Sequence, residues 1–86
     1  MNTTDRIFQL RLSLLRELNA CGTHACPELA LINAMYAAVI PPPTKIEVIT
    51  ECQWLANEDY IVVVNDSLGG SRKYRITDNG RLALHA

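Results

Sequence analysis

The chain has 86 residues, of which 49% are hydrophobic and 20% are charged, and its formal net charge is −1. This length accommodates one domain, predicted over residues 3–86, and the hydrophobic fraction is large enough to build a core. The near-neutral balance excludes an evenly basic nucleic-acid coat protein and an acidic tail. The longest apolar run is far too short to span a bilayer, and the N-terminus lacks the layout of a secretory signal. We therefore expect a cytoplasmic protein with no membrane partner.

Three cysteines agree with a reducing compartment, because an odd number leaves at least one thiol unpaired in any disulfide scheme. Cys21, His24 and Cys26 have a spacing that invites a zinc site. A structural zinc site usually takes four ligands in two spaced pairs, and here the fourth ligand would have to be Cys52 or His85, neither of which belongs to a second pair. We expect no metal and no cofactor.

The first predicted helix runs from about residue 4 to residue 21, and Gly22 ends it. Its apolar residues recur at steps of three and four, as in an amphipathic helix, at Ile7, Leu10, Leu14 and Leu18. A second apolar stripe lies beside the first and consists of Phe8, Leu12 and Leu15. This second stripe either widens the buried face or meets a second subunit, and we predict it as the interface of a homodimer.

The second predicted helix begins at Cys26-Pro27-Glu28, where proline and an acidic residue suit the first turn. One apolar stripe consists of Leu29, Ile32, Tyr36 and Val39, with Leu31 and Met35 beside it. Because the helix is apolar over most of its circumference, it is either the central helix of the domain or partly an oligomer face. The three prolines at 41–43 forbid its continuation and predict a stiff, extended link.

The third predicted helix starts at Thr44, because Thr44 and Glu47 match the capping box. Three residues at steps of four and three predict its inward face: Val48, Cys52 and Leu55. We expect the helix to end between residues 57 and 59.

The hydrophobic period then changes from that of a helix to that of strands. Residues 60–64 are β-branched and aromatic, residues 66–71 hold two glycines, and residues 72–77 alternate between apolar and basic side chains. This order predicts an antiparallel hairpin, with Tyr74 and Ile76 facing inward. Thr77 and Asp78 then cap a short final helix.

Two local patterns resemble the winged helix-turn-helix superfamily. Val48-x3-Cys52-x2-Leu55-x4-Tyr60-Ile61 is similar to a third helix that runs straight into the first wing strand. The run from Tyr74 to Gly80 resembles the segment that closes many wings and starts the last helix. The resemblance implies an α+β fold with three helices, a β-hairpin wing and a short C-terminal helix.

The resemblance extends to details outside these two patterns. Residues 23–25 stand where such domains often place a minor third strand. The long first helix and the segment around Trp54-Leu55 look like small winged-helix proteins of Mu-like prophages. The chain departs from the superfamily in having Pro41-Pro42-Pro43 where a short, often glycine-containing turn is typical.

Winged helices often bind double-stranded DNA, with the third helix in the major groove and the wing on the backbone. The resemblance therefore implies a small transcriptional regulator, and the second apolar stripe of the first helix offers a place for it to form a homodimer. Its candidate DNA-binding residues are Lys45, Thr50 and Gln53 on the third helix and Ser71, Arg72, Lys73 and Arg75 on the wing. The net charge is +1 over residues 1–22, −4 over residues 23–59 and +2 over residues 60–86. Because an acidic third helix opposes docking on phosphate, the wing is the stronger candidate, although a charge run on a strand is also typical of a solvated face.

The alternative is a protein-interaction module without DNA binding, since the fold alone does not decide function. Ile46 and Ile49 on the outer face of the third helix suit a protein partner better than a groove, and Glu47 and Glu51 favour the same interpretation. We do not expect an enzyme, because the sequence shows no catalytic triad in a supporting context and no phosphate-binding glycine loop.

Overall fold

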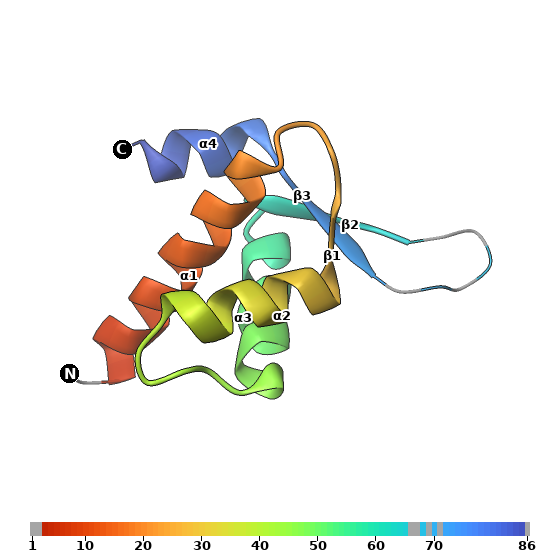
Figure 1. The fold of residues 1–86 in the computed structure, drawn as a ribbon. Helices are drawn as coiled ribbons and strands as arrows, with labels where there is room; N and C mark the ends of the chain where they lie inside the picture. Colours follow the sequence, from red (N-terminus) through yellow and green to blue (C-terminus); the bar gives the residue numbers. More distant parts are fainter. Residues whose placement is uncertain (1–2, 66–67, 69, 71, 86) are drawn as a thin grey trace.

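The computed structural model describes residues 3–65, 68, 70 and 72–85. Within them the chain is α+β, with four helices and one three-stranded antiparallel sheet (Figure 1). The elements are α1 (Thr3–Ala20), β1 (Cys26–Pro27), α2 (Glu28–Ala38), α3 (Lys45–Asn57), β2 (Ile61–Val64), β3 (Lys73–Ile76) and α4 (Asp78–Leu84). Figure 1 shows the helices gathered at one end, with β2 and β3 extending away from them. The helices and the two longer strands follow the predicted order along the chain. No helix in the described part of the chain has both the length and the hydropathy needed to cross a membrane.

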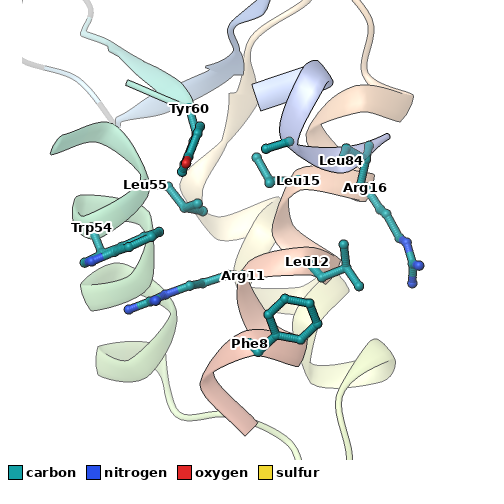
Figure 2. A pocket seen from close by; sticks show the side chains of 10 residues that line it. Phe8, Arg11, Leu12, Leu15, Arg16, Trp54, Leu55, Tyr60 and Leu84 are labelled. Atoms are coloured by element: carbon teal, nitrogen blue, oxygen red, sulfur yellow. The ribbon is translucent and has the colours of Figure 1, made fainter. Parts of the chain in front are cut away.

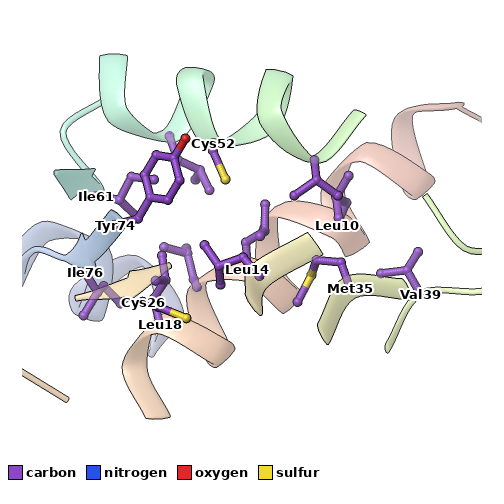
Figure 3. Close-up of a cluster of buried hydrophobic side chains, with 14 residues drawn as sticks. Leu10, Leu14, Leu18, Cys26, Met35, Val39, Cys52, Ile61, Tyr74 and Ile76 are labelled. Atoms are coloured by element: carbon purple, nitrogen blue, oxygen red, sulfur yellow. The ribbon is translucent and has the colours of Figure 1, made fainter. Parts of the chain in front are cut away.

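The core lies where α1, α2 and α3 meet and continues to the inner face of the sheet (Figure 3). The predicted leucines of α1 at positions 10, 14 and 18 are buried there, and Ile7 at the start of the same stripe is partly buried. The predicted inward residues of α3 are buried as well: Val48, Cys52 and Leu55. Each fully buried leucine contributes about 1.5–3 kcal/mol relative to an exposed one, so this cluster holds the three helices together.

The sequence left open which side of α2 is buried, and the structure decides it. The helix buries Leu31 and Met35, with Val39 following at its C-cap, whereas Leu29 and Tyr36 are each 66% exposed. Both stripes are apolar, so the sequence of α2 has no polar side to mark the surface. Only the positions of α1 and α3 determine which stripe is covered.

The start of α3 confirms the predicted capping box. The backbone N–H of Glu47 donates to Thr44 Oγ1 at 3.1 Å, and the backbone N–H of Thr44 donates to Glu47 Oε1 at 3.0 Å. Two backbone amides that the helix leaves without partners are thereby satisfied. The helix ends at Asn57, at the near edge of the predicted range.

The sheet has the order β1-β3-β2, and both pairings are antiparallel. β2 and β3 pair antiparallel, and the predicted alternation of β3 is present, since Tyr74 and Ile76 are buried while Arg75 is exposed. The third strand was expected at residues 23–25 and instead forms at Cys26–Pro27, opposite Tyr74 and Lys73. Cys26 fits this position because it is a buried core residue, whereas Thr23 and His24 are exposed.

The short helix α4 begins as predicted, with Thr77 as its N-cap. Thr77 Oγ1 accepts a hydrogen bond from the backbone N–H of Gly80 at 3.1 Å and donates one to the carbonyl of Asp59 at 2.7 Å. Asp59 has a φ of 64°, a left-handed conformation that aspartate tolerates better than most residues. The turn after α3 and the start of α4 are therefore joined, which fixes where the hairpin leaves the helices.

Candidate nucleic-acid interface

The helix α3 has three sides with different surroundings. Its core side is described above. A second side carries Glu47, Glu51 and Trp54, and these side chains meet residues of α1. The third side, at steps of four and three, points away from the other helices and carries exposed residues at Ile46, Thr50, Gln53 and Asn57. Thr50 and Gln53 therefore lie together on the outer surface, as the sequence predicts for base-reading residues.

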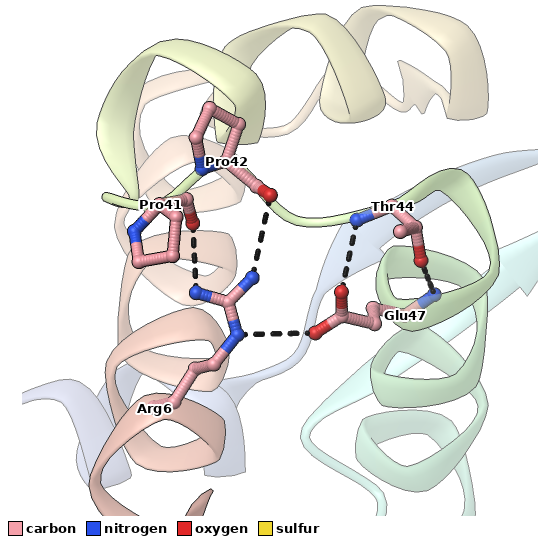
Figure 4. Close-up of polar contacts among 5 residues, drawn as sticks. All are labelled: Arg6, Pro41, Pro42, Thr44 and Glu47. Carbon is pink, nitrogen blue, oxygen red and sulfur yellow. Dashed lines mark hydrogen bonds and ion pairs between the residues drawn. The ribbon is translucent and has the colours of Figure 1, made fainter. Parts of the chain in front are cut away.

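Arg6 of α1 holds the start of α3 in place (Figure 4). Its Nε donates to Glu47 Oε2 at 3.2 Å, and its two terminal nitrogens donate to the carbonyls of Pro41 at 2.7 Å and Pro42 at 3.3 Å. The hydrogen bond from the backbone of Thr44 lowers the pKa of Glu47 below its usual value, and Arg6 lowers this pKa further. The proline link between α2 and α3 is thus fastened to α1 together with the first turn of α3.

Arg11 neutralises the second glutamate of α3. Arg11 Nε lies 2.6 Å from Glu51 Oε1, and the guanidinium lies 3.5 Å from the ring centroid of Trp54 (Figure 2). Glu51 is only 8% exposed, so its negative charge is stabilised by the ion pair with Arg11 rather than by water. The ring of Trp54 also packs near that of Tyr60, with a centroid separation of 6.1 Å.

These two ion pairs neutralise part of the negative charge that residues 23–59 carry. Glu47 and Glu51 are the only acidic residues within α3, and both pair with arginines of α1. The sequence interpretation placed them on a face that would suit a protein partner and oppose DNA. The structure corrects this interpretation, because both carboxylates point toward α1. The outer side of α3 carries no acidic side chain.

One basic residue of α3 and one of the hairpin line the same cleft. Lys45 and Arg72 both line a hollow of about 550 Å³, which is also lined by Pro27, Glu28, Leu29, Ile32 and Gly70. The backbone N–H of Glu28 donates to the carbonyl of Arg72 at 2.9 Å, so the first turn of α2 holds the base of the hairpin. The Tyr74 hydroxyl donates to Glu28 Oε2 at 2.6 Å, which engages the acidic residue of this cleft. Burial and then this hydrogen bond raise the pKa of Tyr74.

The remaining basic residues of the predicted wing lie on the opposite face of the sheet. Lys73 and Arg75 alternate with the buried residues of β3, so their side chains point away from the core. Arg75 lines a separate hollow of about 300 Å³ with Val62 and Arg81. The basic run in the sequence is therefore divided between two faces. Ser71, another predicted contact, lies outside the described residues.

The predicted dimer stripe on α1 is also divided. Phe8 is 60% exposed and Leu12 is partly buried, whereas Leu15 is 6% exposed and belongs to the core. The assignment of Leu15 to a subunit interface is thus corrected, because α1 buries a wider face than its leucine stripe alone. Phe8 and Leu12 flank a hollow of about 400 Å³ between α1, α3 and α4 (Figure 2).

The two isoleucines proposed for a protein partner differ in exposure. Ile46 is 77% exposed at the start of the outer side of α3, and Ile49 is partly buried beside it. Ile46 is therefore the most exposed apolar residue on the outer side of α3.

All three cysteines are free thiols, and two of them, Cys26 and Cys52, are buried in the core. Burial raises the pKa of the Cys26 and Cys52 thiols to about 12 in each case, so both remain neutral. Cys21 is partly exposed and lies within hydrogen-bonding reach of Cys26. Among the described residues, no three histidine, cysteine or acidic side chains come together as metal ligands.

The sequence analysis did not identify the two arginines that organise the site. Arg6 and Arg11 were counted only as charges of the first helix. A signal was present in the spacing, since Glu47 and Glu51 are four residues apart and so share one side of a helix. Nothing in the sequence says that α1 covers that side.

Comparison with known proteins gives no family for this chain. No family model matches it, and no curated protein is similar to it.

Proposed function

We propose that this protein is a winged-helix regulator that binds double-stranded DNA through the outer side of α3 and the base of the hairpin. The observation that carries the proposal is the arrangement of charge around α3. Lys45 and Arg72 share one cleft, while Glu47 and Glu51 are neutralised on the side of α3 that faces α1. A phosphate backbone favours a surface on which cations outnumber carboxylates, and in this cleft Lys45 and Arg72 face the one carboxylate of Glu28, which accepts the hydrogen bond from Tyr74.

Each part of this surface has a separate task in the proposal. Lys45 and Arg72 contact phosphates on either side of the groove that α3 enters. Thr50 and Gln53 reach the base edges, where glutamine pairs with adenine. Lys73 and Arg75, on the other face of the hairpin, contact the neighbouring backbone strand. Because four cations each release counterions, affinity falls about 100-fold between 50 and 200 mM salt.

A homodimer completes the proposal. Two copies present two hairpins and two α3 helices to successive turns of the duplex, so a two-fold site doubles the number of phosphate contacts. The exposed Phe8 on α1 lies on a different element from Lys45 and Arg72, so subunit contact and DNA contact do not compete for the same residues.

Fluorescence anisotropy with a labelled duplex of about ten base pairs tests DNA binding by one copy, since half-sites lie about one helical turn apart. Arg72→Gln and Lys45→Gln each weaken binding and reduce its salt dependence. Arg16→Gln removes the same charge from an exposed position on α1 and leaves binding unchanged. The proposal fails if the protein does not bind at low salt, or if all three variants weaken binding equally.

One observation favours the second candidate function, a protein-docking module. Ile46 is 77% exposed on the same outer side of α3, and an isoleucine gains more from an apolar partner than from a polar groove. The variant Ile46→Asn separates the two functions. If α3 lies in a groove, the variant retains DNA binding. If the wild-type protein binds no DNA and the variant loses a protein complex that the wild type forms, the result supports docking.

A further inference from the structure

The outer side of α1 carries a stripe with opposite charges at its two ends. Asp5, Phe8, Leu12 and Arg16 succeed one another at steps of three, four and four, which places them on one side of the helix. Asp5 and Arg16 are exposed, Phe8 is 60% exposed and Leu12 is partly buried. Figure 1 shows α1 at an edge of the molecule, with α2 and α3 on its inner side. We call these four residues the α1 stripe.

The α1 stripe is complementary to itself in one orientation only. Read from its N-terminal end it is acidic, apolar, apolar and basic; read backwards it is basic, apolar, apolar and acidic. Two copies packed antiparallel therefore place acid against base at both ends and apolar against apolar in the centre. A parallel arrangement would place like charges together, which is unfavourable.

We propose that the α1 stripe binds a second copy of this chain in an antiparallel, two-fold arrangement. The proposal rests on the homodimer in the proposed function and names its interface. Asp5 pairs with Arg16 of the partner subunit, and Phe8 packs against Leu12 of the partner subunit. The two-fold axis repeats both contacts, so each dimer has two ion pairs and two apolar contacts.

The hollow beside the α1 stripe enlarges the apolar area that such a dimer covers. It measures about 400 Å³, and Trp54 and Leu84 line it together with Phe8 and Leu12. A two-fold axis between antiparallel helices places the same side of each α1 against the other. The phenyl ring of Phe8 of the partner subunit therefore approaches the side of α1 that borders the hollow. A single pair of helices covers less than the roughly 800 Å² per partner of a standard interface, so this hollow supplies contact area that the dimer needs.

The exposed side of α2 is the other apolar surface that could bind a second copy, but it lacks the charged ends of the α1 stripe. Leu29, Tyr36 and Ile40 are exposed there, but residues 29–43 contain no charged side chain. An uncharged face gives no orientation and selects no partner. The charge order of the α1 stripe is what points to a second copy.

Sedimentation velocity on the full chain over a range of micromolar concentrations tests the interface. Phe8→Ser shifts the protein to monomer, whereas Tyr36→Ser removes an equally exposed aromatic residue from α2 and leaves the dimer intact. A wild-type protein that is monomeric throughout overturns the proposal. A dimer that Tyr36→Ser dissociates and Phe8→Ser does not dissociate overturns it as well.

Charge reversal gives the sharper test. Arg16→Asp alone and Asp5→Arg alone each bring like charges together, and each weakens the dimer about tenfold, because both exposed ion pairs of the dimer are lost. Mixing the two variants restores both attractions and yields a heterodimer. No heterodimer in the mixture, with both variants folded by circular dichroism, refutes the antiparallel pairing.

Neutral substitutions cover the case in which Asp5→Arg disturbs the first turn of α1, where a basic residue is unfavourable. Asp5→Asn and Arg16→Gln each weaken the dimer, and the double variant is no weaker than either single variant if the two residues pair. Additive effects overturn the proposal. The ten-base-pair duplex reports DNA binding by one copy, so a failed dimer leaves that result unchanged and the two failures are distinguishable.

Discussion

Replacing Arg11 by methionine tests whether the ion pair between α1 and α3 stabilises the fold. The substitution keeps an unbranched side chain beside Trp54 but removes the guanidinium that lies 2.6 Å from Glu51. Glu51 is 8% exposed, so its carboxylate would remain largely buried without a partner. Loss of a hydrogen bond to a charged group costs about 1.5–3 kcal/mol, and loss of the stacking on Trp54 costs about 0.5–1 kcal/mol.

The Arg11 side chain is 28% exposed, and solvent screens part of this interaction. We therefore expect a loss of about 2 kcal/mol in the free energy of unfolding. For a domain of this size the melting temperature falls by about 10 °C. Far-UV circular dichroism during urea and thermal denaturation measures both quantities without relying on Trp54 fluorescence, which the substitution itself would change.

A double-mutant cycle separates the ion pair from the loss of packing. Glu51→Leu in the Arg11→Met background removes both charges, and the double variant recovers stability because no buried charge is left alone. Arg81→Met is the matched control, since Arg81 pairs with an exposed Asp78 at 3.1 Å and its loss is not expected to be measurable. The reasoning is refuted if Arg11→Met is no more costly than Arg81→Met, or if the cycle shows no coupling.

Three further predictions concern other parts of the structure. Gly80→Ala destabilises the protein by about 1–3 kcal/mol in urea denaturation, because the added Cβ would collide with the backbone carbonyl of Tyr60; unchanged stability would contradict this close packing. The ionised Glu47 side chain stabilises the fold above about pH 4.5, and this contribution disappears as pH falls through its lowered pKa. Glu47→Gln is therefore less stable than the wild type at pH 7 and equally stable at pH 2. A difference in the free energy of unfolding that persists at pH 2 would contradict this prediction. Cys52 reacts with a thiol reagent at pH 8 much more slowly than Cys21, because burial raises its pKa to about 12; equal rates under native conditions would show that it is accessible.

Elements specified by short-range signals were predicted well from the sequence. The capping box at Thr44 and Glu47 depends on two side chains three residues apart, and it starts α3 where predicted. The hairpin follows from the alternation of β3, in which Tyr74 and Ile76 are buried and Arg75 is exposed. These signals involve residues two or three positions apart, so they can be recognised from the local sequence alone.

The sequence left the buried side of α2 open, because it does not distinguish the two sides. Leu29 and Leu31 are the same residue type two positions apart, yet one is exposed and the other is fully buried. Packing against α1 and α3 makes the choice. For the same reason Leu15 joined the core instead of a subunit interface.

The sequence by itself determined the main element types, their order, the starts of α3 and α4 and the inward face of β3, since each depends on residues close together along the chain. Only the tertiary structure decided how the charges are shared. Arg6 and Arg11 neutralise Glu47 and Glu51 across about 40 positions of sequence, and Lys45 and Arg72 line one cleft. The basic run of the hairpin is divided because successive side chains of a strand point to opposite faces. A net charge of −1 describes the whole chain, but recognition depends on which charges remain at one surface, and folding selects those.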